Sequence, residues 1–148
     1  MEIEMQNSFR TGRVFVVLIS AVGLLTTVAC GDTATDGAGQ DGPVVSEQGL
    51  YEAHITPEPA QPSTGENTLM IHLMDREGNN VEGADLGVEP WMPAHGHGSP
   101  ETPVVEDLGD GIYEVDNLVY SMPGHWEVRI EIKNDGHSDR IVVDYNVE

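Results

Sequence analysis

Cysteine and basic residues are scarce in this chain of 148 residues. It has one cysteine, and its six lysines and arginines face 26 aspartates and glutamates. A single cysteine excludes an intramolecular disulfide, so the folded part must be stabilised by packing. The formal net charge of −20 repels phosphate backbones and argues against nucleic acid as a partner.

Catalytic signatures are also missing from the sequence. It contains no serine-hydrolase elbow, no HExxH pair, no P-loop and no glycine-rich dinucleotide turn. With the only thiol at Cys30, directly after an apolar leader, thiol redox chemistry in the folded domain is excluded as well. We therefore expect that the protein is not an enzyme.

The N-terminal residues have the pattern of an export signal. Arg10 and Arg13 precede the uncharged stretch 14–29, which is short for a membrane span and ends in small residues before Cys30. The ending "TVAC" resembles a bacterial lipobox, in which the cysteine becomes the lipidated first residue. We expect an extracytoplasmic lipoprotein anchored to the membrane through Cys30, on the periplasmic side or at the cell surface. The alternative is an uncleaved signal anchor, which also places the domain outside the cytoplasm.

The composition changes twice along the chain and predicts three regions. Residues 1–29 form the signal peptide. Residues 30–46 follow as the lipidated cysteine and a flexible acidic linker, because glycine, aspartate, alanine and threonine dominate there and cannot form a core. Residues 47–148 form the folded domain.

Apolar residues recur at every second position through most of this domain. In residues 125–132, for example, Trp126, Val128 and Ile130 alternate with polar residues. The same pattern, interrupted by turn signals such as Gly109-Asp110-Gly111, predicts strands at 50–56, 68–75, 84–90, 102–108, 111–118, 125–132 and 139–147. About seven short strands without a convincing helix predict an all-β, immunoglobulin-like β-sandwich.

Two short segments combine methionine, proline and histidine. In "MPAHGHG", residues 92–98, His95 and His97 are two positions apart and project to the same side of an extended segment. In "MPGH", residues 122–125, the central Pro-Gly favours a tight turn. Thioethers select Cu(I), whereas imidazole binds both copper oxidation states. The predicted copper ligands are His95, His97 and Met122, followed by Met92 and His125.

Each of these residues also has a purely structural interpretation. Methionine is an adaptable apolar filler and can plug the end of a sandwich. His125 precedes Trp126, which points inward by the alternation, so His125 should face solvent. The metal interpretation depends on five such residues occurring together in two short loops.

A second stripe, Met70, His72 and Met74, lies on one face of the predicted strand 68–75. Residues two apart along a strand are nearly 7 Å apart, which is wide for three ligands on one ion. We expect this face to be covered by the proline-rich segment 57–67 or by another strand. His54 and His137 look isolated, and we assign them no role.

The segment 83–132 resembles the YtkA-like domains, relatives of the FixH proteins. These small extracytoplasmic β-sandwich domains carry an "MPxHGHG" loop, a "GDGxY" hairpin and an "MPGxWE" strand start, and here the resemblance runs from about Asn67 to Val147. It covers both motifs of the candidate site, with these matching residues: Met92, Pro93, His95, Gly96, His97, Gly98, Met122, Pro123, Gly124 and Trp126. It does not extend to Ser121 or His125.

The resemblance implies a role near copper, since FixH-type proteins are linked to the assembly of copper-containing oxidases and cation pumps. We therefore expect a lipid-anchored copper-binding module that acts in copper handling or envelope protein assembly, with copper as its ligand. An envelope copper protein, an oxidase or an efflux component would be its partner. The alternative is a structural or protein-interaction ectodomain that binds no metal.

Overall fold

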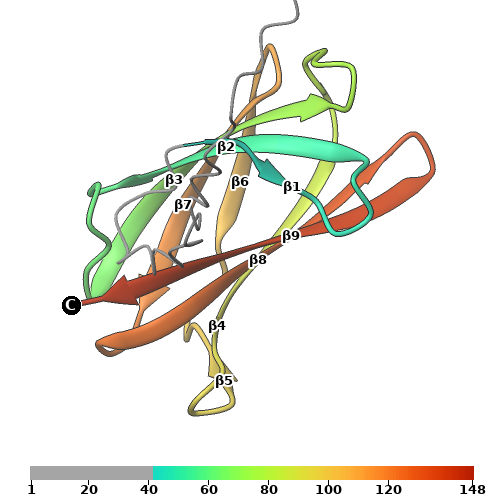
Figure 1. The fold of residues 1–148 in the computed structure, drawn as a ribbon. Coiled ribbons are helices and arrows are strands. Elements are labelled where there is room, and N and C mark those ends of the chain that lie inside the picture. Colours follow the sequence, from blue (N-terminus) through green and yellow to red (C-terminus); the bar gives the residue numbers. More distant parts are fainter. Residues whose placement is uncertain (1–41) are drawn as a thin grey trace, which may run out of the picture. The chain divides into compact units, whose positions relative to one another are not determined.

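The computed structural model describes residues 42–148. The predicted signal peptide, Cys30 and most of the predicted linker lie outside the described residues. The described part contains nine strands and is shown in Figure 1: β1 (Val44–Val45), β2 (Tyr51–Glu58), β3 (Gly65–Asp75), β4 (Asp85–Met92), β5 (His97–Gly98), β6 (Val104–Gly109), β7 (Ile112–Tyr120), β8 (Gly124–Asn134) and β9 (His137–Val147).

The strands form two antiparallel sheets. The five-stranded sheet has the order β1-β2-β3-β7-β6, and the four-stranded sheet has the order β5-β4-β8-β9. Without the two-residue strands β1 and β5, these orders correspond to the ABED and CFG sheets of a constant-type immunoglobulin domain. The predicted all-β sandwich of about seven main strands is therefore confirmed.

The core lies between the two sheets and follows the predicted alternation. On β8, every second residue from Trp126 to Ile132 is buried, whereas the residues between them face outward. On β3, Leu69, Ile71 and Leu73 point into the core. No helix of the described residues is long and apolar enough to span a membrane.

Strand boundaries differ from the prediction where strand pairing extends beyond the local alternation of apolar and polar residues. The third predicted strand was 84–90, but β4 continues to Met92 because Trp91 and Met92 pair with β5. Strands β8 and β9 are each 11 residues long and pair over their whole length. Figure 1 shows them as a long hairpin. Because β5 pairs with β4, the hairpin that follows β4 belongs to the four-stranded sheet.

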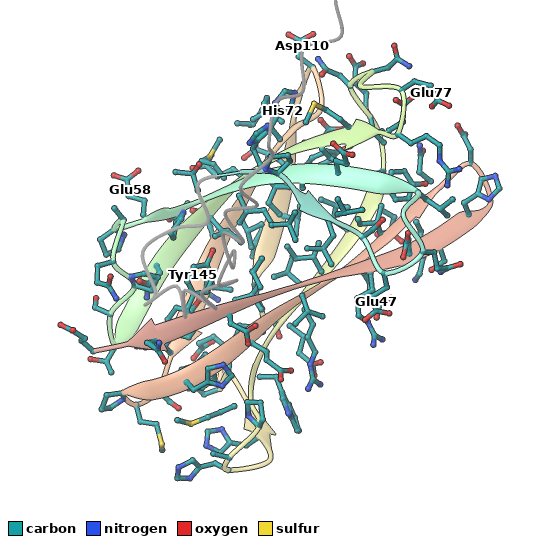
Figure 2. All side chains as sticks on the ribbon, viewed as in Figure 1. Glu47, Glu58, His72, Glu77, Asp110 and Tyr145 are labelled. Carbon is teal, nitrogen blue, oxygen red and sulfur yellow. The ribbon has the colours of Figure 1, made fainter. Side chains whose placement is uncertain are left out.

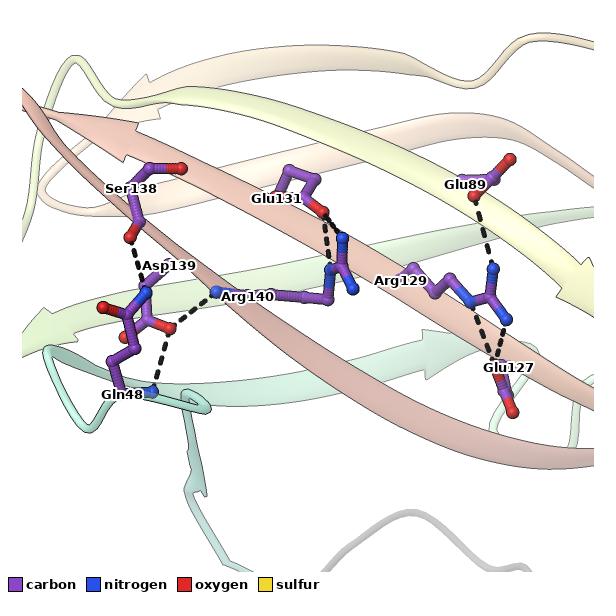
Figure 3. A network of polar contacts seen from close by, with 8 residues as sticks. All are labelled: Gln48, Glu89, Glu127, Arg129, Glu131, Ser138, Asp139 and Arg140. Carbon is purple, nitrogen blue, oxygen red and sulfur yellow. Dashed lines mark hydrogen bonds and ion pairs between the residues drawn. The ribbon is translucent and has the colours of Figure 1, made fainter.

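A buried carboxylate fixes the start of the domain to β9. Asp139 accepts hydrogen bonds from the Ser46 hydroxyl at 2.6 Å and from the backbone N–H groups of Gln48 at 3.0 Å and Leu50 at 3.2 Å. Burial alone would raise the pKa of Asp139, but these bonds and the N–H of Arg140 outweigh it and lower the pKa. Figure 3 shows part of this network.

The outer face of the four-stranded sheet carries ion pairs. Arg129 binds Glu127 at 2.7 Å and lies 3.8 Å from Glu89, and Arg140 pairs with Glu131, as Figure 3 shows. Of the four lysines and arginines in residues 42–148, three lie on strands β8 and β9 and the fourth in the turn after β3. The strands of the five-stranded sheet contain no lysine or arginine.

Candidate functional site

The first predicted loop is a hairpin held by its own backbone. The N–H groups of His95 and Gly96 both donate to the Met92 carbonyl, at 3.1 and 2.9 Å, and Ser99 N–H donates to the Pro90 carbonyl. Gly96 has a φ of 66°, which glycine adopts without the steric cost that a Cβ brings. We call residues 92–98 the histidine hairpin. These backbone bonds hold the turn of the hairpin.

Met92 is the buried base of this hairpin. It is only 3% exposed, and a Cβ at Gly124 would lie 2.5 Å from its terminal methyl group. Gly124 has a φ of 137°, so the second loop uses glycine both for its backbone conformation and for this close approach. Met92 therefore packs the two predicted loops against each other, at the same end of the sandwich.

His97 is oriented by the backbone and by an aromatic ring. Its Nδ1 lies 3.0 Å from the carbonyl oxygen of Gly98, and its ring meets that of Trp126 edge-on at 5.8 Å between centroids. A carbonyl only accepts, so Nδ1 carries the hydrogen and the Nε2 of the neutral ring keeps its lone pair. An imidazole fixed in this way is prepared to bind a metal through Nε2.

His95 stands beside His97 on the exposed tip of the hairpin. The two ring centroids are 5.8 Å apart, with the planes inclined by 63°. Two imidazoles that share one ion through metal–nitrogen bonds of about 2.0–2.1 Å hold their centroids on the order of 5–6 Å apart. The pair therefore already has the spacing of two ligands of one ion.

The second loop is tied to the first through Trp126. The indole Nε1–H donates to the Met122 carbonyl at 3.0 Å, four residues upstream. In immunoglobulin domains a tyrosine near the start of the corresponding strand makes a similar bond back to the chain. Met122 itself is half-buried and packs against the core. Trp126 thus contacts His97 with its ring and fixes Met122 with its N–H.

Tyr120 lies on the core side of Trp126, with ring centroids 5.3 Å apart. Burial, and secondarily the nearby Tyr145, raises the pKa of Tyr120 well above its usual value. Its phenol therefore stays neutral at ordinary pH, and this end of the core supplies no phenolate ligand.

His125 points away from the other candidates. Neighbouring residues of a strand face opposite sides of the sheet, so with Trp126 inward, His125 lies on the outer face. There its Nε2 is 2.9 Å from an Asp144 carboxylate oxygen. His97, in contrast, pairs directly with the inward-pointing Met92, and pairs opposite each other project to one side. The predicted solvent exposure of His125 is confirmed.

The structure thus brings His95, His97 and the Met122 loop together over a buried Met92, and Figure 2 shows ring and sulfur-bearing side chains gathered around β5. His125 is not part of this group. Within residues 42–148 no three or more histidine, cysteine, aspartate and glutamate side chains are grouped to hold a metal ion.

Two expectations for the other sheet are wrong. The outer stripe of β3 is not covered, since Met70, His72 and Met74 are each only half-buried. His54 is not isolated. It lies on β2 directly opposite His72 on β3, and the two rings are stacked with their centroids 6.4 Å apart. Residues 54 and 72 are far apart in sequence, so only the pairing register reveals this contact.

Comparison with known families agrees with the motifs in these loops. The model of the YtkA-like family matches residues 46–131, which is more than half of the chain. The match includes the histidine hairpin and the "MPGH" segment, residues 122–125. No curated protein and no solved structure matches the chain.

Proposed function

Since the chain belongs to the YtkA-like family, we propose that it is an extracytoplasmic copper-binding module and not an enzyme. The leader before Cys30 and the "TVAC" ending support a lipid anchor at the membrane surface. The proposed role is copper handling or envelope protein assembly, with an envelope copper protein, an oxidase or an efflux component as partner.

The paired imidazoles of the histidine hairpin carry this proposal. The carbonyl of Gly98 leaves Nε2 of His97 as the free nitrogen, and the His95 ring stands 5.8 Å away. Met122 is the candidate thioether, because its loop is fixed to the same Trp126 that His97 contacts. Two imidazoles and one thioether are a soft set that suits Cu(I).

The remaining two predicted ligands have other roles in this proposal. Met92 supports the hairpin from below, since its terminal methyl packs against Gly124. His125 is held by Asp144 on the outer face of the sheet. A bound ion would therefore be held by three residues from two loops.

The test is a Cu(I) titration without oxygen against a competing chelator. The full chain is used in detergent with Cys30→Ser, which removes the thiol as a ligand. We expect the double variant His95→Ala/His97→Ala to lose one equivalent of tightly bound copper. His137→Ala is the matched control, because this exposed histidine lies at the other end of β9 from the loops. Equal stoichiometry and affinity in the double variant and the control would contradict the proposal.

The second candidate function is that of a structural ectodomain that binds a protein partner. The burial of Met92 and the Trp126–Met122 hydrogen bond favour it, because they make the two loops a rigid cap. In that case the same double variant changes thermal stability or partner binding, and added copper changes neither.

A further inference from the structure

A pair of histidines lies on the outer face of the five-stranded sheet, away from the histidine hairpin. The antiparallel register places His54 on β2 directly opposite His72 on β3. Residues in such positions have Cβ atoms about 4.5–5.5 Å apart, so both side chains rise from one point of the sheet. Their rings are stacked at 6.4 Å between centroids, with an angle of 25° between the planes. Figure 2 labels His72 on this sheet.

A neighbouring amide orients one ring of the pair. The Nε2 of His72 lies 2.9 Å from Oδ1 of Asn80, which follows the turn after β3 and is bridged to Met74. An amide oxygen only accepts, so Nε2 of the neutral ring carries the hydrogen and Nδ1 keeps the lone pair. Metal-binding histidines usually donate their other N–H to such a group, which fixes tautomer and ring orientation.

Two thioethers lie on both sides of this ring. Met70 and Met74 are the outward neighbours of His72 on β3, each two positions away, and both are half-buried. The rise of an extended strand puts their Cα atoms about 7 Å from that of His72. The methionine side chain has three rotatable bonds and covers this distance readily.

The charge around the pair also favours a cation. The strands of the five-stranded sheet contain eight aspartates and glutamates, and no lysine or arginine. On the same face, Glu52 lies opposite Met74 and Glu114 lies opposite Met70. The nearest charges along the sheet are therefore negative. They raise the local concentration of positive ions.

From this geometry we infer that His54 and His72, together with Met70 or Met74, bind a Cu(I) ion on the outer face of the five-stranded sheet. The ring centroids are 6.4 Å apart. This is slightly more than the separation of about 5–6 Å between the centroids of two imidazoles that bind one ion. His54 is exposed, so rotation of its side chain brings its nitrogen toward Nδ1 of His72. A thioether completes a soft, three-coordinate set.

This site is separate from the one in the proposed function, since it lies on the other sheet and shares no ligand with it. Methionine methyl signals distinguish the two, because the four methionines of residues 42–148 divide equally: Met70 and Met74 lie here, and Met92 and Met122 lie at the histidine hairpin. The experiment is a Cu(I) titration of the full Cys30→Ser chain without oxygen, followed by ¹³C-methyl NMR of labelled methionine.

In the background His95→Ala/His97→Ala, which removes the other proposed site, we expect saturable shifts of the Met70 or Met74 signals at one equivalent. Adding His54→Ala/His72→Ala should abolish these shifts, whereas adding His137→Ala should leave them unchanged. His54 and His72 both face outward, so the methyl spectrum of the folded protein should persist in every variant. Asn80→Ala should weaken binding roughly 10-fold or more, as loss of an orienting partner does.

Two outcomes would overturn the inference. In one, copper moves only the Met122 signal of the parent chain, which leaves the proposed function standing and removes the second site. In the other, the Met70 and Met74 shifts persist without His54 and His72, which would show binding that does not use the histidine pair. Failure of the histidine hairpin alone would instead appear as shifts confined to Met70 or Met74 in the parent chain.

Discussion

The hairpin between β6 and β7 contains two glycines with the same backbone conformation and different surroundings. Gly109 has a φ of 83° and Gly111 a φ of 73°. A Cβ at Gly109 would meet nothing within 4 Å, whereas one at Gly111 would lie 2.7 Å from the Leu73 carbonyl oxygen and 3.1 Å from Cβ of Asn80. Alanine at the two positions therefore separates backbone strain from steric overlap.

For Gly109→Ala we expect a loss of about 1–2 kcal/mol in the free energy of unfolding, the cost of a Cβ in the left-handed region. Gly111→Ala bears the same cost and adds about 1–3 kcal/mol of overpacking. The Leu73 carbonyl is backbone and accepts a bond from Val81 N–H at 3.0 Å, so it cannot move aside without straining that bond.

Urea unfolding of the full Cys30→Ser chain, followed through the fluorescence of its two tryptophans, measures both losses. A difference of about 2 kcal/mol between the variants corresponds to roughly 8–16 °C in Tm for a domain of this size. Equal losses for Gly109→Ala and Gly111→Ala would refute the reasoning, because they would mean that the neighbourhood of Gly111 yields without cost.

Two further predictions concern Asp139 and Trp126. The hydrogen bonds to Asp139 lower its pKa in the folded state. The carboxylate therefore stabilises the fold fully above the unfolded pKa of about 3.9. This contribution is lost as the pH falls from there through the folded pKa. The Tm of the parent should therefore fall more steeply on acidification below about pH 4 than that of Asp139→Asn, whereas a constant Tm difference from pH 3 to 7 would contradict this assignment. Trp126→Phe leaves the Met122 carbonyl without its donor and should cost about 1–3 kcal/mol in urea unfolding. It should also shift the imidazole NMR signals of His97 and leave those of His125, on the other face, nearly unchanged, and an unmoved His97 would show that the ring contact is unimportant.

The sandwich was predictable because each strand buries one face and the alternation records which one. The clearest case is β8, where the apolar residues are the buried ones. The end of β4 was not predictable in the same way. Pro90 looks like a strand end, yet β4 continues to Met92 because β5, two residues long, pairs with it. Such a short strand has no periodicity to detect.

Part of the candidate site was likewise visible in the sequence. The spacing of His95 and His97 predicts neighbouring rings, and they are neighbours, although residues 93–96 form a turn and not the expected extended segment. The alternation that places Trp126 inside also places His125 outside, so the "MPGH" motif is divided between two faces of one sheet. The His54–His72 contact depends on the register between β2 and β3, and no local pattern reports a register.

The histidine hairpin is attached to the fold by the weakest ladder of its sheet. Strands β4 and β5 share two residue pairs, whereas β8 and β9 share eleven. Segments with few backbone bonds and an exposed surface open locally at a free energy well below that of global unfolding. The tip that carries His95 and His97 can therefore separate from β4 while the β8–β9 ladder and the core remain closed. Opening of this tip then requires the rupture of a few hydrogen bonds, and its rate is set by the hairpin and not by the stability of the domain.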